Sequence, residues 1–131
     1  MKLLHIGIIN KDEKESDKFY KDFLRLKRLY EFIIDEELAY SIFKVKEKIR
    51  VIKYGNTNFE IEIFLFKEFK REEPDINHIC IEIDDNINTF LKRAKDYGIE
   101  INIIEREENN LKRKLYFIKD YSGNIYEIKE K

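Results

Sequence analysis

Short blocks of apolar residues alternate with polar turns along the first half of the chain. Residues 3–9 are apolar, rich in isoleucine and followed by a polar turn, so they predict a strand. Aromatic residues and leucines between 19 and 26 recur at helical spacing, which predicts a helix with Ser16 as its N-cap. A strand is expected at 29–34. Residues 38–45 fit either a short helix or the extension of a strand, and we favour the helix.

Two further strands, 49–54 and 59–66, complete the first half. The second of them is the clearest in the chain, because its side chains alternate strictly in character. Successive residues of a strand point to opposite faces. Isoleucines therefore lie on one face of this strand, and Glu60 and Glu62 lie on the other.

The second half repeats the same order of elements. It predicts a strand at 78–83 and a helix that begins at Ile87 and ends at Gly98, a suitable residue to follow a helix C-terminus. The remaining elements are three strands and one polar loop, expected at 99–104, 114–118 and 124–128 for the strands and 105–110 for the loop.

The repeat is visible in the residues themselves. The pattern His-Ile-x-Ile begins at His5 and again at His78, and each half has a later strand that carries a glutamate. The element order is βαβββ twice, which predicts an α+β fold. We interpret residues 1–131 as one domain, with module 1 at about 1–67, a linker at 68–76 and module 2 at about 77–131.

The alternation of strand residues also selects the candidate chemistry. His5, His78, Glu127 and either Glu60 or Glu62 lie on the strand faces opposite the apolar ones. Neutral imidazole and carboxylate together suit a divalent cation such as Zn, Ni, Co, Fe or Mn. The simpler interpretation is that these are solvated polar side chains. The recurrence of one histidine and one glutamate in both halves favours a metal site.

Composition narrows the classes of function. There are 26 basic and 27 acidic residues, so the net charge gives no reason to expect a nucleic acid or a membrane as partner. No apolar run has the length of a membrane span. The single cysteine, Cys80, excludes an intramolecular disulfide and suits a cytoplasmic protein. We interpret it as a small apolar filler on the His78 face.

The order of these segments resembles the vicinal oxygen chelate superfamily, which includes glyoxalases, bleomycin-resistance proteins and dioxygenases, and is most similar to glyoxalase I (lactoylglutathione lyase). The resemblance covers nearly the whole chain. It is carried by short segments in each half, namely His5-Ile6-Gly7-Ile8, Phe19-Tyr20 with Leu24, Ile61-Glu62-Ile63-Phe64, the run from His78 to Asp84, and Asp120, Gly123, Asn124, Glu127 and Ile128.

The resemblance implies two βαβββ modules that form a curled mixed sheet around a cleft, and a homodimer. It implies that His5, Glu62, His78 and Glu127 bind a divalent metal ion, with Glu127 as the preferred base. In glyoxalase-like members the metal binds two vicinal oxygens of a small substrate, and a ligand carboxylate moves a proton on the adjacent carbon.

Two departures from the family pattern stand out. Tyr121 and Ser122 replace the proline and aspartate of the usual Asp-Pro-Asp-Gly-Asn turn, and Arg25 stands where a glycine commonly ends the first helix. No glutathione-binding set is recognisable. A lyase or isomerase that acts on a vicinal-oxygen substrate or its thiol adduct is the first hypothesis. The alternatives are a metal-free binding protein of bleomycin-resistance type and another enzyme such as an extradiol dioxygenase.

Overall fold

The computed structural model describes residues 1–131, which form two compact units, Met1–Lys70 and Arg71–Lys131. These units contain the two predicted modules, and each is described by itself. No helix in the chain is both long and apolar enough to cross a membrane.

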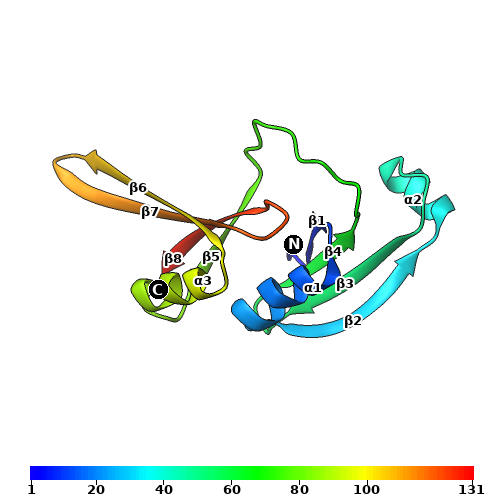
Figure 1. Ribbon diagram of the computed structural model, residues 1–131, viewed down its shortest axis with the longest axis horizontal. Helices are drawn as coiled ribbons and strands as arrows, with labels where there is room; N and C mark the ends of the chain where they lie inside the picture. Colours follow the sequence, from blue (N-terminus) through cyan, green and yellow to red (C-terminus); the bar gives the residue numbers. More distant parts are fainter. The chain divides into compact units, whose positions relative to one another are not determined.

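Module 1 is built on a four-stranded mixed sheet (Figure 1). Its elements follow one another as β1 (Ile6–Asn10), α1 (Glu13–Ser16), η1 (Asp17–Phe23), β2 (Lys27–Ile34), α2 (Glu36–Phe43), β3 (Ile49–Gly55) and β4 (Glu60–Leu65). The strand order is β1-β4-β3-β2, with β1 parallel to β4 and the other neighbours antiparallel. The short helix favoured from the sequence is α2.

Module 2 repeats this arrangement without the extra helix. Its elements are β5 (His78–Ile83), α3 (Ile87–Asp96), β6 (Glu100–Glu108), β7 (Leu111–Lys119) and β8 (Ile125–Glu130). The strand order β5-β8-β7-β6 has β5 parallel to β8, as β1 is to β4. Both predicted βαβββ modules are therefore confirmed, each with its own sheet. Asn86 caps α3, and Gly98 has the expected positive φ of 66°.

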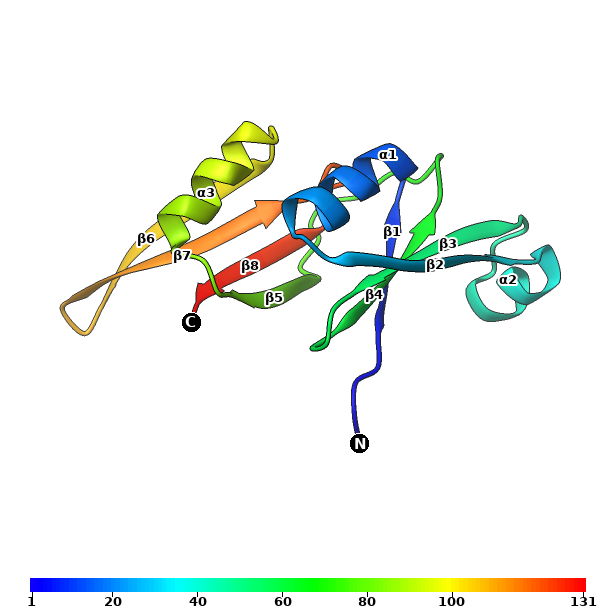
Figure 2. The same cartoon turned by 90° about the horizontal axis from the view of Figure 1, so that it is seen from below.

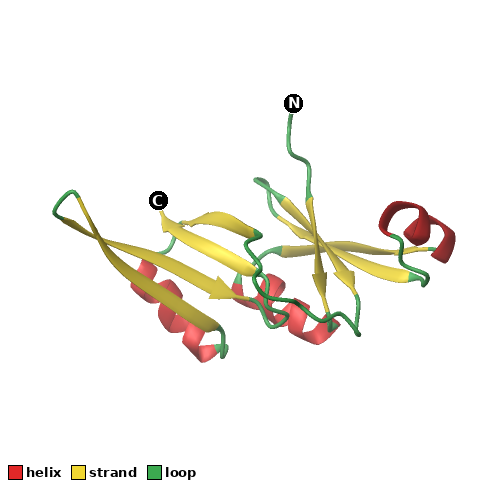
Figure 3. Cartoon of the chain, turned by 90° about the horizontal axis from the view of Figure 1, so that it is seen from above, coloured by secondary structure: helices red, strands yellow, loops and turns green.

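One face of each sheet packs against its helix and forms the core. In module 1, Ile61 and Ile63 are fully buried, and the Tyr54 ring lies 5.5 Å from that of Tyr20 on η1. In module 2, α3 runs along one face of the sheet (Figure 3), on which Tyr126 and Ile128 are buried. The predicted alternation places Glu62 and Glu127 on the opposite faces, which we call the open faces.

The open face of module 1 carries a second cluster of apolar residues at one end. Helix α2 brings buried Ala39 against Ile34, Ile49 and Val51, with Phe64 packed beside them. Burial of these side chains stabilises α2, which as a helix of eight residues is too short to be stable by itself.

The first helix begins earlier than predicted. Asp12, not Ser16, is the N-cap, since its carboxylate accepts a hydrogen bond of 2.9 Å from the amide of Glu15. Ser16 is buried within the helix and donates its hydroxyl to the Asp12 carbonyl. The following turns are wide, because the amide of Leu24 bonds the carbonyl of Phe19 five residues back. Arg25 ends the segment with a φ of 60°, the conformation that a glycine would supply.

The prediction of a polar loop at 105–110 is wrong. Strands β6 and β7 run through it as a hairpin that extends beyond the other strands (Figure 2), with a turn of only two residues, Asn109 and Asn110. Both have positive φ, 51° and 63°, as the tight hairpin turn requires. The polar residues of this segment form cross-strand pairs, such as Lys114 with Glu105 at 3.4 Å.

Candidate functional site

Strands β1 and β4 bring His5 and Glu62 together. Gly7 is the register partner of Glu62, and His5 lies two residues before Gly7 and so on the same face. The Nε2 atom of His5 lies 3.3 Å from Oε2 of Glu62. Glu60 is instead paired with Lys53 at 3.0 Å. Of the two candidate glutamates, Glu62 is therefore the one placed beside His5.

Strands β5 and β8 repeat this pairing in module 2. Cys80 is the register partner of Glu127, and His78 lies two residues before Cys80. His78 Nε2 lies 3.9 Å from Glu127 Oε2. The repeat thus extends from the residue types to their positions in the sheet, because each histidine precedes the partner of its glutamate by two residues.

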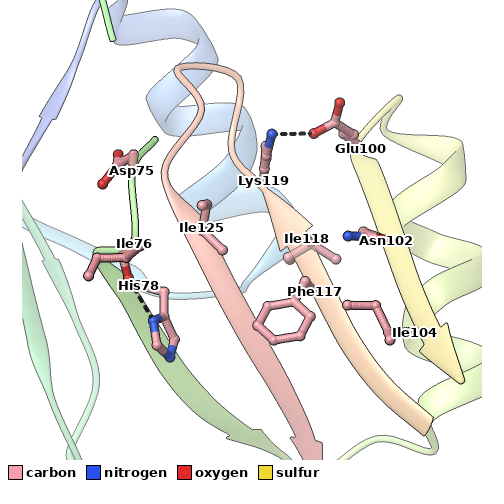
Figure 4. A pocket seen from close by; sticks show the side chains of 10 residues that line it. All are labelled: Asp75, Ile76, His78, Glu100, Asn102, Ile104, Phe117, Ile118, Lys119 and Ile125. Carbon is pink, nitrogen blue, oxygen red and sulfur yellow. Dashed lines mark hydrogen bonds and ion pairs between the residues drawn. The ribbon is translucent and has the colours of Figure 1, made fainter. Parts of the chain in front are cut away.

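The ring of His78 is oriented by a backbone carbonyl two residues earlier in the chain. Its Nδ1 atom lies 3.1 Å from the carbonyl oxygen of Ile76 (Figure 4). A carbonyl only accepts, so Nδ1 carries the proton of this hydrogen bond, and Nε2 is the ring nitrogen on the side of Glu127. A backbone carbonyl that fixes the tautomer in this way is typical of metal-binding histidines.

Each pair combines an imidazole nitrogen with a carboxylate oxygen, and both are common ligands of divalent cations. Donors bound about 2.1 Å from one metal ion are about 3.0–3.4 Å apart in tetrahedral or octahedral geometry. The 3.3 Å separation of His5 and Glu62 matches this edge, and the 3.9 Å of His78 and Glu127 requires a small side-chain movement. Within neither module do three or more histidine, cysteine, aspartate or glutamate side chains gather to hold a metal ion. Each module holds one histidine–glutamate pair.

Lys53 is the residue beside these pairs that the sequence analysis missed. Its ammonium, with a side chain only 10% exposed, lies 3.0 Å from Glu60 and 3.5 Å from Glu62. Interaction with the Tyr30 and Glu60 side chains raises the pKa of Lys53 above its ordinary value. The signal was present in the alternation, because a lysine in phase with Ile49 and Val51 is placed on a partly buried face.

The two modules differ at this equivalent position. Lys53 is the cross-strand partner of Glu62, whereas Phe117 is the cross-strand partner of Glu127. Beside Glu127 the nearest lysine is Lys129, whose side chain is 56% exposed and whose ammonium lies 3.8 Å from the carboxylate. Glu62 is therefore held by a buried cation, and Glu127 is the less restrained of the two carboxylates.

Both open faces are hollowed beside their pair. In module 1 a pocket of about 720 Å³ includes His5 and Glu62 in its wall. In module 2 a pocket of about 360 Å³ includes His78 and Phe117, and its far wall carries Asn102 and an ion pair between Lys119 and Glu100 of 3.2 Å (Figure 4).

Cys80 shows no sign of activation as a nucleophile. Partial desolvation and the negative charge of Glu127 raise the pKa of its thiol. Reactive cysteines have the opposite shift, since the thiolate is the reacting form.

No model of a protein family matches the sequence, and no curated protein matches it. Solved structures do. A glyoxalase family protein from Enterococcus faecalis superposes with a TM-score of 0.72 at 19% identity, over 97% of this chain and 95% of that one. A glyoxalase/bleomycin resistance protein/dioxygenase from Alicyclobacillus acidocaldarius gives 0.66 at 22% identity, over 98% and 90%. The chain has the glyoxalase fold.

A second kind of protein shares this glyoxalase fold. The fosfomycin resistance protein FosX from Listeria monocytogenes superposes with a TM-score of 0.71 at 17% identity, over 100% of this chain and 93% of that one. A variant of that protein was solved with Mn(II) and 1S,2S-dihydroxypropylphosphonic acid. These likenesses, all below 25% identity, establish the fold, which is the one that the vicinal oxygen chelate resemblance predicted.

Proposed function

We propose that this chain is a metal-dependent lyase or isomerase of the glyoxalase type, which acts on a small substrate with two vicinal oxygens or on its thiol adduct. The observation that carries the proposal is the His–Glu pair repeated at equivalent register positions in two modules. A sheet face that only meets solvent has no need to repeat it. The presence of Mn(II) in a FosX structure of the same fold supports a divalent metal.

In this proposal His5, Glu62, His78 and Glu127 hold the metal ion. When bound, such an ion polarises the oxygens of the substrate and stabilises the negative charge that develops on them. Glu62 has a buried ammonium at 3.5 Å, which restrains its carboxylate. Glu127 lacks a buried cation and is suited to exchange a proton.

The reaction of a thiol hemithioacetal needs only proton movements. Glu127 takes the proton from the carbon that bears the thiol sulfur and returns it to the neighbouring carbonyl carbon. The hydroxyl proton passes to the former carbonyl oxygen. The product is an isomer of the substrate, so no oxidant or reductant is consumed.

Replacement of the base tests this role. Glu127→Gln keeps the side-chain volume and removes the basicity, so activity on the methylglyoxal–thiol hemithioacetal should fall by about two to four decades, the usual contribution of a positioned general base. Metal affinity should fall moderately, and the circular dichroism spectrum should be unchanged. Glu60→Gln, on the same face but paired with Lys53, should leave activity nearly unchanged. Equal activity of Glu127→Gln and wild type would contradict the assignment.

A metal-free binding protein is the second candidate function. The observation in its favour is the pocket of module 1, whose wall is mostly aromatic and aliphatic. If wild type is inactive on such adducts with every divalent metal, and small hydrophobic ligands raise the melting temperature in EDTA, the binding function replaces the lyase.

A further inference from the structure

Four phenylalanine rings surround the pocket of module 1. They come from three parts of the module, namely Phe43 at the end of α2, Phe64 in β4, and Phe66 and Phe69 after it. Phe43 is 47% exposed, and the other three are partly exposed. Apolar surface that stays in contact with water is unfavourable, at about 25 cal/mol for each Å². Four rings gathered on one hollow are therefore better explained by a ligand than by the stability of the module.

Gly7 has no side chain, and the ring of Phe64 occupies the space that a side chain would take. A Cβ atom at Gly7 would lie 2.8 Å from Cε2 of Phe64, so any other residue would displace the ring. The Phe64 ring thus lies over Gly7 of β1, in edge contact with Phe43 at 5.5 Å between centroids. In module 2 the position equivalent to Gly7 is Cys80, and that of Phe64 is Lys129. The aromatic wall is a property of module 1 alone.

The pocket also lacks a cation for an anionic group. Its polar side chains are His5 and Glu62, and no lysine or arginine lines it. The ammonium of Lys53 is already in contact with two carboxylates. Phosphonates and carboxylates are bound in proteins by arginine, lysine or helix N-termini. Apart from a metal ion held by His5 and Glu62, an anionic group in this pocket would meet only the negative charge of Glu62.

We propose that this pocket binds a neutral aromatic group of the substrate and directs the vicinal oxygens of the same molecule towards His5 and Glu62. The inference rests on the proposed function for the oxygens, but its aromatic part stands on the pocket alone. The substrate class is an uncharged aryl hydroxyketone, diol or related adduct, rather than a phosphonate or an aliphatic acid.

Three small probes separate the contributions. 2-Hydroxyacetophenone, hydroxyacetone and mandelate all carry vicinal oxygens, but only the first is both aromatic and neutral. Titration calorimetry in EDTA should show 2-hydroxyacetophenone binding at least tenfold more tightly than either of the others, as expected for burial of a phenyl group without an unpaired charge. With Mn²⁺ present, the preference for 2-hydroxyacetophenone over hydroxyacetone should persist, and both affinities should rise.

A cation added at the rim should reverse the preference. Phe43→Lys places an ammonium in the pocket wall at the helix C-terminus, where a cation is tolerated. Mandelate should gain at least tenfold over 2-hydroxyacetophenone relative to wild type. Ile42→Lys is the matched control, because Ile42 is 57% exposed on the same helix and does not line the pocket. It should leave the ranking unchanged.

The outcomes distinguish this inference from the proposed function. Aromatic preference in EDTA without any Mn²⁺ binding would keep the pocket assignment and remove the metal centre. Equal binding of the three probes, binding of none, or equal effects of the two lysine variants would overturn the pocket assignment. A fall in molecular mass for Phe43→Lys by light scattering, with no change in probe binding, would show that a second copy covers the pocket and would also overturn it.

Discussion

Replacement of Lys53 by methionine tests how the two carboxylates of module 1 are held. Met keeps most of the side-chain stem and removes the ammonium. At the observed distances of 3.0 and 3.5 Å, the attraction to Glu60 and Glu62 is about 5 kcal/mol each with an effective dielectric constant of 20. Desolvation of Lys53 offsets much of this, and the Glu60 side chain is 38% exposed. We expect a net loss of about 1–3 kcal/mol in the free energy of unfolding.

The same change should have the opposite effect on a bound cation. The ammonium repels a dication held by Glu62, by roughly 1–2 kcal/mol across about 5 Å of high-dielectric surroundings. Lys53→Met should therefore bind Mn²⁺ or Ni²⁺ about tenfold more tightly, although it is less stable in EDTA.

Urea unfolding in EDTA and metal titration calorimetry measure the two effects. Lys129→Met is the control, since Lys129 lies 3.8 Å from Glu127 but is 56% exposed, and it should change stability by less than about 0.5 kcal/mol. The reasoning is refuted if the two variants are equally stable, or if Lys53→Met weakens metal binding.

Two further predictions concern acid stability and assembly. Hydrogen bonds from Arg50 and Arg28 lower the pKa of Glu13 from 4.5 to about 2, so the contribution of Glu13 to stability is complete above about pH 4.5 and is lost as the pH falls towards 2. Because the Glu13 side chain is 35% exposed, Glu13→Gln should lower the free energy of unfolding in urea by about 1 kcal/mol at pH 7. A loss of the same size near pH 2 would contradict this reasoning. The exposed apolar residues Tyr30 and Ile33 on edge strand β2 favour a symmetric dimer of about 32 kDa, twice the 16.1 kDa chain, and a strictly monomeric mass by light scattering at micromolar concentration would count against it.

The alternation of apolar and polar residues was sufficient to predict both modules and to place the candidate histidines and glutamates on the strand faces opposite the core. A period of two decides which side chains share a face, and the structure confirms that Ile61 and Tyr126 face the core while Glu62 and Glu127 do not. The helical spacing of Leu38, Ile42 and Val45 also identified α2, although a strand was a reasonable alternative.

The errors arose where local signals compete or where a contact is distant in sequence. Asp12 and Ser16 are both good N-cap residues, and the hydrogen bond from the Glu15 amide to the Asp12 carboxylate shows that the earlier one is used. The segment 105–110 looks like a loop in the sequence because it has no apolar residue. Its side chains instead form charge pairs across the β6–β7 hairpin. Lys53 was missed because its role depends on ion pairs with Glu60 and Glu62. The antiparallel register of β3 and β4 brings these residues together.

Metal content measures the central claim most directly. Chain purified without a histidine tag should bind close to one Ni²⁺, Zn²⁺ or Mn²⁺ per chain by calorimetry, and the ion should raise the melting temperature, because binding to the native state alone stabilises it. His5→Gln and His78→Gln should each weaken binding by tenfold or more, since each removes one of the four donors proposed here. Identical melting curves in EDTA and in excess metal, together with no detectable binding heat, would contradict the account.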